Sequence, residues 1–352
     1  KDRNFRVSEK AILLGLLGGY FIHNIFVFDH LISYILFFSF LAYLHASGGR
    51  EKSFLGEKTL SQMGNMIAGA IVIVVLVLTI WFVNVPAMQT AYAVIQAISP
   101  QEGGPVENLK WHKRANEINF IGRQEATEQL LLAAETVARG TNDQELRSTF
   151  FEAARSEMLE ELERNPNDAR TQVLMGSFLN NFNRTQESLG YIERAHELSP
   201  MKQQISFLLG LTHIANGNEE KALPLFKEAF ESAPQYEEAR QMYVVALVYN
   251  REFVLADQVL AEYYGADVLP NNQRLLQAYH SVGRFDKVVD IWELRANLNP
   301  QDAQTRVSLA AAYYQAGRPQ EAIEILRQVI AQVPSFKEQG EELIRQIQAG
   351  TL

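Results

Sequence analysis

Four polar residues interrupt the apolar run of residues 11–46, and they are the first candidates for chemistry in this chain. His23, Asn24, Asp29 and His30 stand within the sequence YFIHNIFVFDHLISYILFF. They could hold a metal ion, transfer a proton or mark a turn. The two histidines offer at most two metal ligands, and the chain has no cysteine that could add a thiolate. We therefore expect no metal and no cofactor.

A single helix over residues 11–46 would be about 54 Å long, whereas the hydrocarbon core of a bilayer is about 30 Å thick. We therefore expect the run to fold back at its polar residues. Residues 1–46 would then hold two membrane helices, 11–28 and 31–46, joined by a turn at Asp29 and His30. A third apolar run, MIAGAIVIVVLVLTIWFV, has no charged residue and predicts a third transmembrane helix at 64–85.

Basic residues predict how these helices are oriented. Lysine and arginine cluster before the first helix and in the loop 47–63, and the next one after that loop is Lys110. By the positive-inside rule, residues 1–10 and 47–63 face the cytoplasm and the chain after about residue 85 faces outward. The sequence thus predicts a multi-pass protein of a bacterial cytoplasmic membrane, with the lipid bilayer as its first partner.

The charge of the chain limits its function. Residues 1–62 have seven basic and five acidic side chains and therefore a net charge of +2. Because the whole chain has a net charge of −9, the other residues carry −11. An acidic domain argues against a nucleic acid partner. The sequence has no phosphate-binding glycine loop, HExxH or GxSxG, and we expect no catalytic residue in it. His112, within the basic sequence KWHKR, is expected on an exposed helix surface.

Prolines recur with a fixed period in the second half of the chain. They stand at 166, 200, 234, 300 and 334, at intervals of 34, 34, 66 and 34, and a 34-residue period is the signature of tetratricopeptide repeats. We predict an all-α fold in which transmembrane helices, a hairpin plus one further span, precede a tetratricopeptide-repeat α-solenoid. The expected segments are a linker with a short amphipathic helix at 86–108, degenerate helical repeats at 109–166, tetratricopeptide repeats at 167–335 and a capping helix at 336–352.

The first helix of each repeat would line a concave groove. Its predicted lining is Asn180, Asn181, Phe207, Leu211, Gln241, Tyr249, Gln277, His280, Tyr314 and Gln315. No lysine or arginine is among them, which argues against binding of the terminal carboxylate of a peptide. Amide and aromatic side chains suit an extended peptide, a sugar chain or solvent alone, so the predicted partner is a protein or glycan ligand or none.

The two halves together resemble the C-terminal end of bacterial O-antigen ligase-like membrane proteins. The resemblance is carried by HNIFVFDHLISYILFFSFLAYLHA with its basic loop and further span, and by ERNPNDARTQVLMGSFLN, LSPMKQQISFLLG and PSFKEQGEELI in the repeats. In that family a histidine–hydrophobic–Phe–Asp element closes the second-last membrane helix. This element matches His23, Asn24, Phe26, Phe28 and Asp29.

The resemblance implies a glycosyl transfer, in which an undecaprenyl-diphosphate-linked glycan moves to a lipid or protein acceptor outside the membrane. The family's catalytic arginines and histidine lie in an external loop that this chain does not match, so the resemblance assigns no catalytic residue here. Because residue 1 is Lys rather than Met, we expect further membrane helices upstream. The alternative function is a non-enzymatic, membrane-anchored repeat scaffold that organises an envelope complex.

Overall fold

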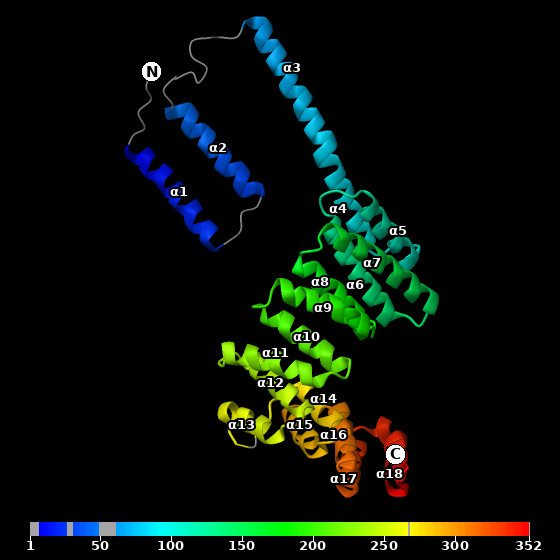
Figure 1. Ribbon diagram of the computed structural model, residues 1–352. Coiled ribbons are helices and arrows are strands. Elements are labelled where there is room, and N and C mark those ends of the chain that lie inside the picture. Colours follow the sequence, from blue (N-terminus) through cyan, green and yellow to red (C-terminus); the bar gives the residue numbers. More distant parts are fainter. Residues whose placement is uncertain (1–6, 27–30, 49–60, 267, 352) are drawn as a thin grey trace. The chain divides into compact units, whose positions relative to one another are not determined.

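The computed structural model describes residues 7–26, 31–48, 61–266 and 268–351, without the side chains of residues 21, 23–26, 31–33 and 45–48. Every element in these ranges is a helix. The chain divides into two compact units between Ile80 and Trp81. Figure 1 labels the helices of both units.

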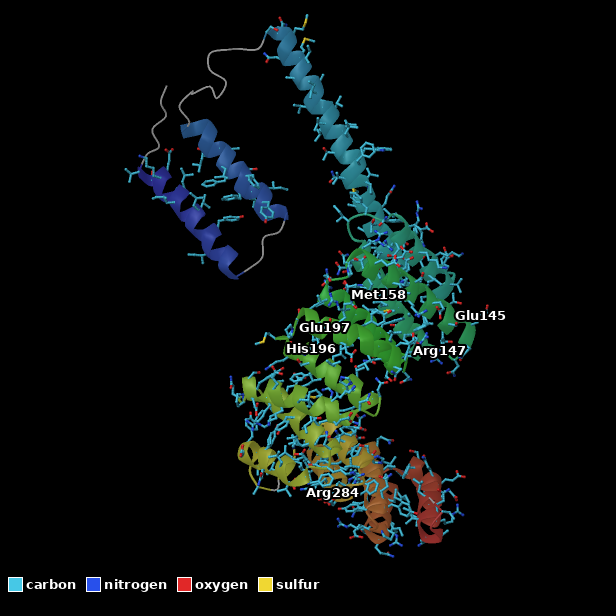
Figure 2. The ribbon with its side chains drawn as sticks, viewed as in Figure 1. Glu145, Arg147, Met158, His196, Glu197 and Arg284 are labelled. Carbon is cyan, nitrogen blue, oxygen red and sulfur yellow. The ribbon has the colours of Figure 1, made fainter. Side chains whose placement is uncertain are left out.

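The first unit contains three apolar helices, α1 (Val7–Phe26), α2 (Leu31–Gly48) and α3 (Gln62–Thr79). α1 and α2 touch through the stacked rings of Tyr20 and Phe37, whose centroids are 4.3 Å apart. None of the α3 side chains is buried, and Figure 2 shows them projecting on all sides of the helix. A helix that is apolar all round requires a protein core or a membrane around it.

One helix in the described part of the chain is long and apolar enough to cross a membrane, and it runs from Gln62 to Ile98. It contains α3, a π-helical turn (Ile80–Asn84) and α4 (Val85–Ile98). The predicted third span, 64–85, lies inside this helix.

The two predicted spans 11–28 and 31–46 overlap α1 and α2. Within the described residues, however, neither helix is both long and apolar enough to cross a membrane. α1 has the charged residues Glu9 and Lys10 in its first turns, which shorten its apolar stretch. In α2 the described apolar segment is the shorter Tyr34–Leu44. A transmembrane hairpin is therefore not supported by the helices as described.

The second unit begins with α4, followed by α5 (Gly104–Glu117), α6 (Arg123–Gly140) and α7 (Gln144–Arg164). α4 packs on α5 and α6, and its buried side chains are Thr90, Ala93 and Ala97. Small residues on that side allow the neighbouring helices to come close. The segment expected to be a linker with a short amphipathic helix, 86–108, thus contains the first helix of the helical stack, and a π-helical turn connects α3 to α4.

Between residues 169 and 332 the described chain forms five consecutive helical hairpins (Figure 1). Their helices are α8 (Ala169–Asn181), α9 (Thr185–Leu198), α10 (Gln203–Ala215), α11 (Glu219–Ser232), α12 (Glu237–Tyr249), α13 (Phe253–Tyr264), α14 (Gln273–Ser281), α15 (Phe285–Leu298), α16 (Ala303–Gln315) and α17 (Pro319–Gln332). A 3₁₀ turn (Pro334–Phe336) leads into α18 (Lys337–Ala349), which packs on α17. The predicted all-α solenoid is confirmed.

The turn inside each hairpin has one residue in the left-handed region of backbone conformation. These residues are Asn183, Gly217, Arg251, Gly283 and Gly317, with φ of 58°, 72°, 61°, 79° and 73°. Successive positions are 34, 34, 32 and 34 residues apart. The turns of the third and fourth hairpins are therefore two residues closer in sequence than the others, in agreement with the proline interval of 66 rather than 68.

The two helices of a hairpin approach most closely where the first helix has a glycine. An ideal Cβ placed on Gly176 would lie 2.1 Å from Cδ1 of Ile192, and one placed on Gly210 would lie 2.2 Å from Cε1 of Phe226. Both partners are fully buried in the second helix of the same hairpin. These glycines are required because any side chain would push the helices apart.

Candidate ligand-binding groove

An open groove of about 570 Å³ lies along the first helices of the last three hairpins, α12, α14 and α16. It is lined by Tyr249, Gln273, Leu276, Gln277, His280, Ser281, Val288, Trp292, Ser308, Ala311, Ala312 and Gln315. Val288 and Trp292 come from α15 and supply apolar surface to the groove. None of the lining residues is a lysine, arginine, aspartate or glutamate.

The groove opens where the residue at the hairpin crossing changes from small to large. The position of Gly176 in α8 and Gly210 in α10 is occupied by Leu276 in α14. The backbones of α14 and α15 accordingly pack less closely than those of α8 and α9. α14 also has only nine residues, and Trp292 is only half-buried. A bulky crossing residue in a short helix thus explains why an indole ring is accessible here.

Trp292 is held in place by its own helix. The guanidinium of Arg295 lies over the indole ring, 4.7 Å from its centroid. Nε of Arg295 donates a hydrogen bond of 2.7 Å to Oδ1 of Asn271, so this positive charge is engaged within the protein. Burial lowers the pKa of Arg295 from its ordinary value, yet arginine stays protonated at physiological pH. The groove therefore presents an oriented aromatic ring without a free charge beside it.

Three glutamines in the groove have side chains that make no hydrogen bond within the described chain: Gln273, Gln277 and Gln315. Gln273, Gln277 and His280 lie on one face of α14, at the spacing of helical turns. All are exposed, and each amide offers both donors and acceptors. The opposite side, on α16, has the small residues Ser308, Ala311 and Ala312. The groove thus offers unpaired amides beside an apolar surface.

Comparison with known proteins identifies the repeats. Residues 163–334 match the family described as tetratricopeptide repeat. The chain contains a tetratricopeptide-repeat domain. The five hairpins α8–α17 and the groove belong to this domain, as the proline period predicted. No curated protein matches the chain.

Solved structures similar to the tetratricopeptide-repeat domain and its neighbouring helices include a tetratricopeptide repeat protein from Parabacteroides merdae. It is 14% identical, with a TM-score of 0.49, over 74% of this chain and 99% of the other. Yeast Tom70 is 15% identical, with a TM-score of 0.41, over 70% of this chain and 50% of its own. YrrB, a tetratricopeptide-repeat protein with an unusual peptide-binding site, is 16% identical, with a TM-score of 0.30, over 63% and 92%. At these TM-scores the likenesses carry no argument about function.

The structure places four of the ten residues predicted for the groove around it: Tyr249, Gln277, His280 and Gln315. Two others bond to neighbouring repeats instead. Nδ2 of Asn180 donates to Oγ1 of Thr212 (2.8 Å), and Nδ2 of Asn181 donates to Oε1 of Glu135 (2.8 Å). These two amides connect successive first helices.

The remaining four predicted residues are engaged in packing or in local hydrogen bonds. Phe207 is buried and Leu211 packs against the same core. Nε2 of Gln241 donates to Oη of Tyr264 (2.7 Å), and Tyr314 packs against the core at the C-terminal end of the domain. The groove is therefore shorter than predicted and confined to the last three repeats.

Trp292 was not predicted to line the groove, because the repeat register assigns it to a second helix, whose side chains normally pack inside the hairpin. A signal was present in the sequence, since Leu276 stands where two other repeats have glycine. The prediction used only first helices and therefore missed it.

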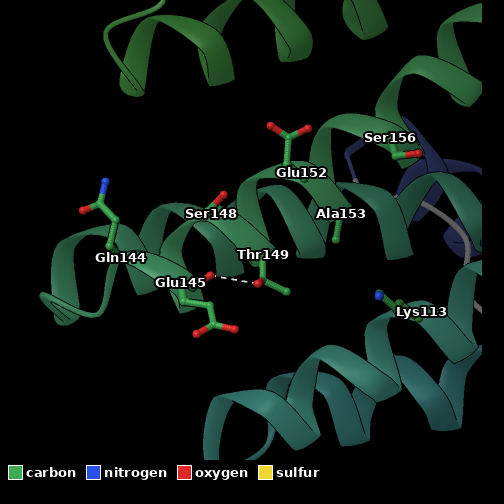
Figure 3. A pocket seen from close by; sticks show the side chains of 8 residues that line it. All are labelled: Lys113, Gln144, Glu145, Ser148, Thr149, Glu152, Ala153 and Ser156. Atoms are coloured by element: carbon green, nitrogen blue, oxygen red, sulfur yellow. Dashed lines mark hydrogen bonds between the residues drawn. The ribbon is translucent and has the colours of Figure 1, made fainter.

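A second hollow, of about 960 Å³, lies between α5 and α7 (Figure 3). Lys113 of α5 points toward a row of side chains on α7 that includes Glu145, Thr149 and Glu152. Oγ1 of Thr149 donates to the backbone carbonyl of Glu145 (2.8 Å). Its lining has no aromatic ring and Ala153 is its one apolar residue. Unlike the groove, this hollow offers no aromatic ring to a ligand.

His112 is fully buried, and the expectation of an exposed position was wrong. Its ring lies in the stack of α4 to α7, in the wall of a cavity shared with Ala97, Ala133 and Phe150. Neither ring nitrogen has a hydrogen-bond partner in the described chain. Burial lowers the pKa of His112 to about 4, so the ring is neutral at physiological pH.

The residues of segment 1–46 that carry the family resemblance lie mostly beyond what the structure describes. His23, Asn24 and Phe26 belong to α1, but their side chains are not described, and Phe28 and Asp29 lie outside the described residues. Elsewhere in the described chain, no three histidine, aspartate or glutamate side chains come close enough to hold a metal ion.

Proposed function

We propose that this protein is a membrane-anchored scaffold whose groove binds an extended segment of a partner protein. The observation that carries the proposal is the groove itself: an oriented indole ring beside three unpaired amides, with no charged residue in the lining. Repeat solenoids use extended surfaces of this kind to bind their partners.

The chemistry of the groove suits a peptide backbone. An extended peptide presents N–H and C=O groups in alternation, and the glutamines Gln273, Gln277 and Gln315 can pair with either. Trp292 and Val288 provide apolar surface for one or two side chains of the peptide. A phosphate or a terminal carboxylate would need an arginine or lysine, and the lining has neither.

The helix Gln62–Ile98 supports an anchor in a lipid bilayer. Two further membrane spans, arranged as a hairpin, are proposed on the apolar sequence of residues 11–46 alone. The basic residues of segments 1–10 and 47–63 support a cytoplasmic position for these segments. The proposed location is accordingly a bacterial cytoplasmic membrane, with the repeat domain on its outer side.

The proposal is tested by selecting peptides from a random displayed library on the full chain in lipid nanodiscs. The affinity of the selected peptides is then measured for the double variant Gln277→Ala/Gln315→Ala. Both glutamines are exposed and unpaired, so their loss should leave the fold intact. We expect binding to weaken about tenfold, because two hydrogen bonds contribute roughly 1.4 kcal/mol together.

Gln320→Ala is the matched control, since Gln320 is an exposed glutamine in α17 that does not line the groove. Its affinity for the peptides should equal that of the wild type. Failure to select any peptide, or selective binding of oligosaccharides by the same groove, would overturn the proposal. So would equal affinities of the double variant and the control.

We propose a second, wider role on the residues of the membrane half alone. The resemblance of His23, Asn24, Phe26, Phe28 and Asp29 to a motif of O-antigen ligase-like proteins supports membership in a glycan ligase, which would use an undecaprenyl-linked glycan and a lipid or protein acceptor. The comparisons add no support to this role. Deletion of the gene should then abolish attachment of a surface glycan, and an unchanged glycan profile would refute it.

A further inference from the structure

The outward side of α4 is a continuous apolar surface next to the membrane helix. Met88, Tyr92, Ile95 and Ile98 are all more than half exposed, and Ala91 is exposed beside them. Their spacing of three and four residues places them on one stripe of the helix. The opposite side of α4 is buried against α5 and α6. A helix at the surface of a soluble domain would have polar residues on such a stripe.

The stripe extends onto α5 through an aromatic pair. The rings of Tyr92 and Trp111 meet edge to face, with centroids 5.8 Å apart, and Trp111 is half-buried. Tyrosine and tryptophan are enriched at the level of lipid headgroups. Lys110 and Arg114, beside Trp111 on α5, have well-exposed side chains, and each forms an ion pair with a glutamate one turn away on the same helix, at 2.8 and 3.5 Å. An apolar stripe edged by aromatic and basic side chains has the composition of a membrane-interface surface.

The length of the helix Gln62–Ile98 indicates that a lipid bilayer covers this surface. Gln62–Ile98 has 37 residues and is about 55 Å long, whereas a bilayer with its headgroups is about 40–45 Å thick. A span centred on α3 therefore places the start of α4 at the level of the headgroups. The π-helical turn Ile80–Asn84 and Pro86 stand between the two. Irregular turns and prolines are the places where helices change direction.

We propose that α4 and Trp111 dock on the surface of the lipid bilayer, so that the repeat domain is held against the membrane instead of hanging from a free tether. This inference rests on the proposed membrane anchor and goes beyond it. The ligand is a lipid headgroup layer with the adjoining acyl chains, which accept the apolar stripe, while Lys110 and Arg114 meet lipid phosphates.

The three tryptophans of the chain allow a direct test. Trp81 lies in the π-helical turn beside the apolar helix α3, Trp111 in the proposed docking surface and Trp292 in the groove. Three variants, each with one tryptophan kept and the other two changed to phenylalanine, are reconstituted as full chains in nanodiscs. The lipids are either unmodified or brominated near the headgroup or near the chain ends, and bromine quenches nearby tryptophans.

We expect lipid brominated near the headgroup to quench Trp111 and to leave Trp292 unchanged. Trp81 should be quenched by at least one of the brominated lipids. In the Trp111 variant, Ile95→Glu should remove the quenching, because it places a charge in the stripe. Gln89→Glu is the matched control, since Gln89 is exposed on α4 beside the stripe, and it should keep the quenching.

The outcomes separate the docking surface from the anchor. If Trp81 is quenched and Trp111 is not, the docking surface is refuted and the membrane anchor is still supported. Trp111 emission that is blue-shifted but not quenched would then indicate that another protein segment covers this surface. If Trp81 is not quenched by any of the brominated lipids, both the anchor and the docking are refuted.

Discussion

Replacing Gly210 with alanine tests how closely the two helices of a repeat approach. An ideal Cβ on Gly210 would lie 2.2, 2.4 and 3.0 Å from three carbons of the Phe226 ring. Phe226 is fully buried, so the ring cannot turn away without displacing its neighbours. Overpacking of this kind costs about 1–3 kcal/mol.

Gly190→Ala provides the matched control, because Gly190 is an exposed helical glycine of α9 with no atom within 4 Å of an added Cβ. Both changes gain the helix propensity of alanine, about 1 kcal/mol each, and this gain cancels when the two variants are compared. Gly190→Ala should therefore be more stable than the wild type, and Gly210→Ala should be about 1–3 kcal/mol less stable than Gly190→Ala.

The assay is amide hydrogen exchange of the full chain, read for the segments of α9, α10 and α11, so that both mutated helices are included. Local exchange is preferred to a global unfolding curve because the stability of a solenoid is a sum of repeat and interface contributions. The free energy of opening of these segments should fall in Gly210→Ala relative to Gly190→Ala. Equal protection in the two variants would refute the close helix crossing on which the repeat assignment depends.

Four further substitutions test single positions. Burial lowers the pKa of His112 to about 4, so on acidification the unfolded chain binds a proton before the folded chain does. The free energy of opening of the α4–α7 segments should therefore fall by about 2 kcal/mol between pH 7 and pH 5. Hydrogen exchange of His112→Leu should show a smaller fall, and an unchanged fall would contradict the burial of His112. Arg251 has a positive φ of 61°, so Arg251→Gly should stabilise the third repeat by about 1 kcal/mol, and a lower opening free energy in exchange would contradict this. Oη of Tyr279 is buried without a partner in the described chain, so Tyr279→Phe should be neutral or stabilising by about 1 kcal/mol. Tyr313→Phe loses a hydrogen bond to Glu293 and should be destabilising in the same exchange measurement.

The repeat architecture could be predicted because its period depends on local chemistry. The left-handed turn residues, among them Gly217 and Gly317, and the prolines between hairpins follow a 34-residue spacing that is two residues short between the third and fourth hairpins. Each unit repeats the same local rules, so one unit predicts the next. The packing of α4 was harder to predict, because the sequence indicated a short amphipathic helix within 86–108 but not that it packs on α5 and α6.

The site could be predicted only in part. Gln277 and Gln315 follow from the register of first helices, but whether such an amide is free depends on its neighbours in other repeats. Asn180 has the same chemistry and bonds to Thr212. The burial of His112 likewise depends on packing by α4, α6 and α7. Those helices lie outside the regular repeats, where the period gives no register.

The most direct test of the proposed function is the affinity of selected peptides for Ala311→Arg, measured on the full chain in nanodiscs. Ala311 is exposed and lines the groove, so an arginine there should fill the groove and reduce peptide affinity at least tenfold, or about 1.4 kcal/mol. Ala261→Arg, at an exposed alanine of α13 outside the groove, should bind like the wild type. Undiminished peptide binding by Ala311→Arg would contradict the groove as the binding site.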